Sequence, residues 1–147
     1  MTTDETTGHV ARAEVTIDAD RATVWSALTK PAELKKWMFG TELHTDWSVG
    51  SPVTWSGEMD DKPYEDKGEV LVVDEPEHLA MTHYSPLSGA DDVPESYHRL
   101  DYRLAELDGS TVVTLDQDGN DSAEQAEQFS GTWQQMLDSL KQTVEGS

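Results

Sequence analysis

SAEQAEQFSGTWQQMLDSLKQTVE, residues 122–145, is the stretch that decides how the rest of the chain folds. Its apolar residues recur at spacings of three and four, the period of one face of an α-helix. They are Ala123, Ala126, Phe129, Trp133, Met136, Leu137, Leu140 and Val144. Ser122 and Gln125 have the spacing of a capping box at its start. The stretch predicts a long helix whose wide apolar stripe needs a concave surface, which a curved sheet supplies.

The length and composition predict one folded domain. The chain has 147 residues, the size of a single domain that buries its own core. Residues 1–8 are polar and are predicted to be a disordered N-terminus, with the domain spanning 9–147. The absence of cysteine excludes disulfides and cysteine-bound metals, and suits a cytoplasmic protein. Neither a signal-peptide pattern nor a long apolar run is present, so no membrane insertion is expected.

The charge of the chain is strongly one-sided. Thirty acidic residues oppose ten basic ones, for a formal net charge of -20. Because 35% of the residues are hydrophobic and fall into periodic segments, an acidic coat on a folded protein is predicted rather than disorder. Salt screens such a coat, which favours a halophilic source; a basic protein partner is the alternative. Nucleic acid and anionic membranes are disfavoured as partners because both would be repelled.

The first third of the chain predicts one strand and two short helices. Residues 11–17 alternate between apolar and polar, the period of a half-buried strand. Asp18 or Asp20 can cap a helix that begins near Arg21. Lys30-Pro31 ends that helix, and Pro31 can open the next one at its first position.

The middle of the chain predicts strands separated by turns. Asp60-Asp61-Lys62-Pro63 is a turn cluster and Asp108-Gly109 is a hairpin signal. The predicted strands are two within residues 41–58 around Gly50, then Lys67–Asp74 (buried on both faces), His78–Tyr84, Tyr97–Leu107 and Thr111–Gln117. Segregated strands and helices predict an α+β fold: a curved antiparallel sheet of about six strands around the long C-terminal helix. A sheet and helix that do not close fully leave a cavity between them.

This order of elements, with several local patterns, resembles the START-like helix-grip (SRPBCC) superfamily. Within it, the chain is similar to the branch containing the C-terminal domain of the activator of the Hsp90 ATPase. The residues that carry the resemblance are Ile17-Asp18-Ala19-Asp20, Val24-Trp25, Leu28-Thr29, Pro31, Leu34, Trp37, Gly68-Glu69-Val70, Pro76, Leu79, Gly109-Ser110-Thr111-Val112-Val113-Thr114, Gly131-Thr132-Trp133, Leu137 and Leu140. The resemblance covers about residues 10 to 145 and implies a helix-grip fold with a pocket between helix and sheet. It also implies an apolar ligand or a protein partner such as Hsp90, with cyclisation or hydrolysis in a few members and no universal catalytic residue.

The candidate pocket residues are mainly large apolar and aromatic ones, because such side chains suit an apolar ligand. They are Trp37, Met38, Trp55, Met81, His83, Tyr102, Phe129, Trp133 and Met136. The alternative is that they simply fill the core, which burial alone would explain.

His83 is predicted to share an inward strand face with Leu79 and Met81. A neutral imidazole there can orient the polar end of a ligand or act as a general base. The alternative is a buried histidine bonded to a neighbour, with Tyr102, Tyr84 and His98 as candidate polar neighbours.

No pattern of established catalytic or metal chemistry stands out. The five histidines lack metal-ligand spacing, and neither a GxSxG elbow nor a glycine-rich phosphate loop is present. No catalytic residue, metal or cofactor is therefore predicted. The sequence favours a non-catalytic binding module for a small apolar or amphipathic ligand. The alternatives are a co-chaperone-like interaction protein and, less favoured, a small-molecule cyclase or hydrolase using His83 and a tyrosine.

Overall fold

The computed structural model describes residues 9–59, 61–86 and 91–146. Its elements are β1 (His9–Ile17), α1 (Arg21–Thr29), α2 (Pro31–Trp37), β2 (Glu42–His44), β3 (Pro52–Met59), β4 (Lys62–Asp74), β5 (His78–His83), η2 (Pro94–Ser96), β6 (His98–Leu107), β7 (Ser110–Asn120) and α3 (Ala123–Glu145). The predicted disordered segment 1–8 lies outside the described residues.

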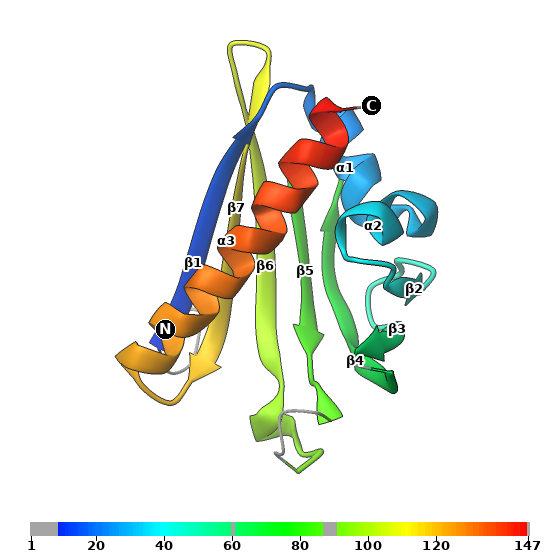
Figure 1. Ribbon diagram of the computed structural model, residues 1–147, viewed down its shortest axis with the longest axis vertical. Helices are drawn as coiled ribbons and strands as arrows, with labels where there is room; N and C mark the ends of the chain where they lie inside the picture. Colours follow the sequence, from blue (N-terminus) through cyan, green and yellow to red (C-terminus); the bar gives the residue numbers. More distant parts are fainter. Residues whose placement is uncertain (1–8, 60, 87–90, 147) are drawn as a thin grey trace.

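The strands form one antiparallel sheet in the order β1-β7-β6-β5-β4-β3-β2. The predicted α+β class is confirmed, and the sheet has seven strands where about six were expected. Figure 1 shows α3 running diagonally across one face of this sheet, with α1 and α2 beside its C-terminal half. Among the described residues, no helix is both long and apolar enough to cross a membrane.

The helices begin where the sequence predicts. Asp20 caps α1, its carboxylate accepting from the Thr23 backbone N–H at 2.9 Å. Pro31 is the first residue of α2, where its missing N–H costs nothing. Ser122 caps α3 by accepting from the backbone N–H of Gln125 at 3.0 Å. These caps fix where each helix starts, and therefore which of its residues face the sheet.

Local backbone features bend and connect the strands. Asp108 and Gly109 both have positive φ, 51° and 87°, as a two-residue hairpin between β6 and β7 requires. A register shift between Val70 and Val72 marks a bulge in β4. Just before it, a Cβ on Gly68 would lie 1.8 Å from the Thr82 carbonyl oxygen, so only glycine fits there. The bulge and this close approach allow the sheet to curve.

Two predictions about β4 are wrong. The strand starts at Lys62, not Lys67, and Pro63 pairs with Glu58 instead of lying in a turn. Proline is tolerated there because it stands near the start of the strand. The strand is also not buried on both faces: Val70 is buried, whereas Leu71, Val72 and Val73 are half-buried. The reason is that the three helices cover only one face of the sheet (Figure 1).

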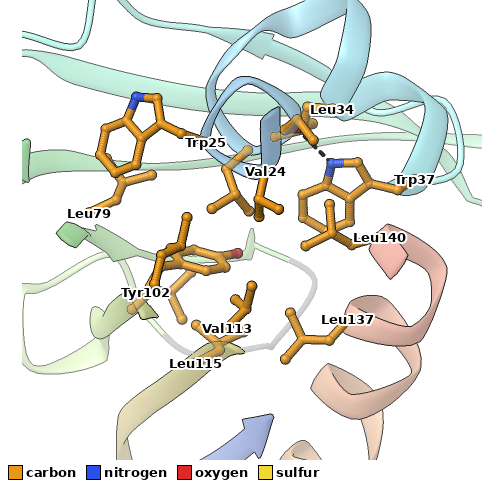
Figure 2. Packing of buried hydrophobic residues seen from close by; sticks show 14 of the residues in the cluster. Val24, Trp25, Leu34, Trp37, Leu79, Tyr102, Val113, Leu115, Leu137 and Leu140 are labelled. Atoms are coloured by element: carbon orange, nitrogen blue, oxygen red, sulfur yellow. Dashed lines mark hydrogen bonds between the residues drawn. The ribbon is translucent and has the colours of Figure 1, made fainter. Parts of the chain in front are cut away.

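The core lies between the C-terminal half of α3, the two short helices and the sheet. Figure 2 shows Leu137 and Leu140 of α3 facing Val113 and Leu115 of β7, with α1 and α2 residues packed above. Both leucines are fully buried. Burying one such side chain contributes about 1.5–3 kcal/mol, so this half of the helix anchors the fold.

Candidate functional site

A cavity of about 180 Å³ lies between α3, the end of α2 and the inner face of the sheet. Most of its wall is apolar: Leu28, Leu34, Met38, Trp47, Trp55, Leu79, Met81, Leu100, Trp133 and Met136 line it. The remaining lining residues are Thr41, Tyr64, Asp66, His83, Ser85 and Tyr102. Met38, Trp133 and Met136 are half-buried, so this cavity approaches the surface beside the middle of α3.

The cavity coincides with a change of character along α3. Leu137 and Leu140 are fully buried, whereas Trp133 and Met136, nearer the N-terminus of the helix, are half-buried and line the cavity. The Trp133 indole Nε1 donates to Gln117 Oε1 on β7 at 2.7 Å. That bond fixes the ring, because an indole N–H has a single hydrogen to donate.

Tyr102 on β6 is a buried wall residue with an unused polar group. Its side chain is 6% exposed, and its hydroxyl forms no hydrogen bond with the described residues. Figure 2 shows the ring with its oxygen directed toward the interior. Burial raises the pKa of Tyr102 well above the ordinary value, because the phenolate would lose its hydration. The neutral phenol is therefore the form present at neutral pH.

Four of the polar lining residues form two hydrogen-bonded pairs, which define the polar end of the cavity. Thr41 follows α2, Tyr64 and Asp66 lie on β4, and His83 ends β5. Thr41 Oγ1 donates to the Met38 carbonyl oxygen at 2.7 Å, which uses its single hydrogen. The 2.7 Å bond between Thr41 Oγ1 and Tyr64 Oη must therefore be donated by Tyr64. The lone pairs of the Tyr64 oxygen stay available to accept.

Asp66 and His83 form a largely buried pair. His83 Nε2 lies 2.9 Å from Asp66 Oδ2, and the two side chains are 17% and 18% exposed respectively. An ionised carboxylate only accepts, so Nε2 carries the proton. Trp55 packs its ring against His83 edge-on, with centroids 5.1 Å apart. The pair is thus fixed at the polar end of the cavity.

Asp66 Oδ1 and His83 Nδ1 are buried without a hydrogen bond among the described residues. A buried polar atom left unpaired costs about 1–3 kcal/mol, and more when it is charged. Such groups call for an explanation, of which an occupant of the cavity is one.

The structure brings most of the predicted pocket residues together. Met38, Trp55, Met81, His83, Tyr102, Trp133 and Met136 line the cavity. Trp37 does not: it is 1% exposed in the core and donates through Nε1 to the Ala27 carbonyl oxygen at 2.8 Å. Phe129 is also absent from the lining, and its ring faces His98 at 6.2 Å. The apolar stripe of α3 is longer than the cavity, which explains why Trp133 lines the cavity and Phe129 does not.

The residues predicted as polar neighbours of His83 do not form its hydrogen bond. Its partner is Asp66, whereas His98 Nδ1 bonds the Asp118 carbonyl oxygen at 2.6 Å. Tyr64, Asp66 and Trp47 were not predicted as pocket residues at all. The signal for two of them was present, because Tyr64, Asp66, Gly68 and Val70 alternate along β4 once the strand is extended back to Lys62.

In the part of the chain that the structure describes, no group of three or more histidine, aspartate or glutamate side chains is arranged to hold a metal ion. The polar end of the cavity supplies one imidazole and one carboxylate.

Comparison with known proteins places the chain in a family. The model of the family described as "Activator of Hsp90 ATPase homolog 1-like protein" matches residues 18–145. The chain belongs to this family. None of the curated proteins searched matches the chain.

Solved structures of this Hsp90-activator-like family and its neighbours share the architecture. The solution structure of ChR145 from Cytophaga hutchinsonii is 37% identical with a TM-score of 0.83, and the match covers 97% of each chain. MLL2253 from Mesorhizobium loti is 19% identical with a TM-score of 0.75, over 95% of this chain and 98% of that one. The Aha1 dimer from Colwellia psychrerythraea is 19% identical with a TM-score of 0.71, over 93% and 96%. The last two show similarity of fold alone. The predicted helix-grip architecture and family are thus confirmed.

Proposed function

We propose that this protein is a non-catalytic binding module that holds a small apolar or amphipathic molecule between α3 and the sheet. The observation that carries the proposal is the cavity of about 180 Å³ with a mainly apolar wall. An engineered apolar cavity of about 150 Å³ is enough to hold benzene. The expected ligand therefore has a body of about one ring.

The lining supports an amphipathic ligand rather than a purely apolar one. Met38, Met81 and Met136 offer flexible, polarisable contacts that adapt to the shape of a guest. Asp66 and His83 supply a polar end, with two atoms that lack partners among the described residues. An apolar wall with a few convergent polar groups is typical of small-molecule sites.

The proposal is tested with phenethyl alcohol as the probe, in a titration followed by ¹H–¹⁵N NMR in molar potassium chloride. Saturable shifts are expected for residues that line the cavity. Trp133→Ala should weaken binding about tenfold or more, because one aromatic contact is lost. Phe129→Ala is the matched control, since this half-buried aromatic lies one helical turn away but not on the cavity wall.

Equal losses in Trp133→Ala and Phe129→Ala would show that α3 is merely destabilised. A probe that produces no saturable shift at millimolar concentration would remove the binding-module proposal altogether.

The acidic surface is proposed to be an adaptation to high salt. Among the described residues, Asp101 and Asp118 are the buried acidic side chains, so nearly all of the negative charge is at least partly exposed. Screening should then relieve repulsion, and the thermal midpoint should rise steadily from low to molar potassium chloride. A midpoint that does not move would contradict this. A cytoplasmic location, expected from the lack of cysteine, is part of the same proposal.

A co-chaperone role is the second candidate, favoured by the family description and by one surface feature. Phe39 is 75% exposed two residues after the end of α2, so its ring is accessible to a protein partner. Stimulation of an Hsp90-type ATPase from the same source, lost in Phe39→Ser, would support this role. An ATPase rate that the protein leaves unchanged would exclude it.

A further inference from the structure

The polar end of the cavity offers hydrogen-bond acceptors. His83 Nε2 carries the proton shared with Asp66, so Nδ1 of the neutral ring is an acceptor. Asp66 Oδ1 is a second acceptor, and neither atom has a partner among the described residues. Tyr64 donates its hydrogen to Thr41 and keeps lone pairs that can accept. A ligand group that donates several hydrogen bonds matches this arrangement.

The charge at this end is also unbalanced. No lysine or arginine among the described residues forms an ion pair with Asp66, whose partner is His83. Lys67, the next residue on β4, is paired with Asp92 instead. With Asp66 only 18% exposed, its charge is weakly screened by solvent. A cation fits this site and a carboxylate would be repelled.

Aromatic rings surround the same position. Trp55 lies opposite Asp66 in the register between β3 and β4, and its ring contacts His83. Tyr64 lies two residues from Asp66, on the same face of β4, and also lines the cavity. Aromatic faces attract a cation held near them, most strongly when it is desolvated. The net charge of -20 further raises the local concentration of cations.

The geometry points to a small apolar amine as the ligand: a body of about one ring that bears a primary ammonium group. The ammonium lies at the polar end beside the Asp66 carboxylate, while the ring lies against the methionine and tryptophan wall. This inference rests on the proposed binding function of the cavity. It adds that the polar end selects for a cationic donor.

Three probes share one ring and a two-carbon chain but differ in charge: phenethylamine, phenethyl alcohol and phenylacetate. Differences in their affinity therefore measure the effect of charge at nearly constant size. NMR titrations at about pH 8 in molar potassium chloride keep the amine charged, since aliphatic amines titrate near pH 10. Phenethylamine should bind at least about tenfold more tightly than phenethyl alcohol, through charge-assisted hydrogen bonds. Phenylacetate should bind most weakly of the three.

Asp66→Asn tests the residue itself. Its affinity for phenethylamine should fall to about that for phenethyl alcohol, a far larger loss than any change in its affinity for the uncharged alcohol. Glu65→Gln is the matched control, because the neighbouring carboxylate is exposed and does not line the cavity. It removes the same charge and should leave all three affinities as in the wild type.

The outcomes separate the two proposals. If phenethyl alcohol binds but phenethylamine binds no more tightly, the amine inference is overturned while the binding module stands. Equal losses in Asp66→Asn and Glu65→Gln would also overturn it, since only the overall charge would then matter. If no probe binds, both proposals fail. If Asp66→Asn does not fold, the ranking of the probes on the wild-type protein decides alone.

Discussion

The described residues include two largely buried histidine–aspartate pairs whose surroundings differ. His78 Nε2 lies 2.7 Å from Asp101 Oδ1 and His83 Nε2 lies 2.9 Å from Asp66 Oδ2, with side-chain exposures of 11–18% in both pairs. Asp101 also accepts from Arg99 at 3.1 Å and contacts Arg103 at 3.3 Å. Asp66 has no such additional partners within the part of the chain that the structure describes.

The difference follows from the face of the sheet on which each pair lies. Leu79 and Tyr102 point inward, so His78 and Asp101, their neighbours in sequence, point to the face that carries no helix. There, long arginine side chains reach across and complete the hydrogen bonding of the carboxylate. On the inner face, helices and the cavity exclude such side chains. The outer pair is therefore complete by itself, and the inner pair leaves room for a ligand.

The largest expected effect is the loss of the outer carboxylate. Asp101→Ala should lower the free energy of unfolding by about 3 kcal/mol, because it removes the partner of His78 and Arg99 from a largely buried site. Urea denaturation in molar potassium chloride measures this. Asp74→Ala, an exposed position on β4, is the control and should change stability by less than about 0.5 kcal/mol. A loss below about 1 kcal/mol for Asp101→Ala would mean that the outer pair does not anchor the sheet.

Tyr102 stands next to Asp101 but faces the cavity, and its effect should appear at alkaline pH. Its folded-state pKa is raised by burial, so above about pH 10 the unfolded chain loses this proton while the folded protein keeps it. The free energy of unfolding should therefore fall with rising pH by up to about 1.4 kcal/mol per pH unit. This stability is fully present below the ordinary tyrosine pKa and is lost as pH rises above it.

Tyr102→Phe should remove that part of the alkaline slope. At neutral pH it should change stability by less than about 1 kcal/mol, because the hydroxyl forms no hydrogen bond with the described residues. Urea denaturation of both proteins between about pH 9 and 11 checks the prediction. Parallel pH profiles for the two proteins would show that the Tyr102 hydroxyl reaches solvent.

Much of the fold was predictable because it depends on local patterns. The caps at Asp20 and Ser122, the proline that opens α2 and the hairpin at Asp108-Gly109 all act within a few residues. The apolar residues of α3 recur at spacings of three and four, which likewise predicts the buried face of the helix. Such signals can be recognised in the sequence without knowing which helices or strands pack against these residues.

The candidate site was predictable only in part, because it depends on register between strands. Nothing in the sequence says that Asp66 lies beside His83, seventeen residues away. The pairing required β4 to extend back through Pro63, a residue that reads as a turn when seen alone. Trp37 and Phe129 lie away from the cavity wall for a related reason. Periodicity predicts which face of a helix is buried, but not where along the helix the sheet is far enough away to leave a cavity.

The smallest expected effect is on stability at the inner pair. Asp66→Asn should change the free energy of unfolding by less than about 1 kcal/mol in either direction. The reason is that the variant keeps an oxygen for His83 Nε2 while it removes a buried charge whose second oxygen is unpaired. Urea denaturation of ligand-free protein, in the same buffer used for Asp101→Ala, provides the measurement. A loss as large as that of Asp101→Ala would mean that both pairs are structural, and the distinction between a complete outer pair and an open inner pair would fall.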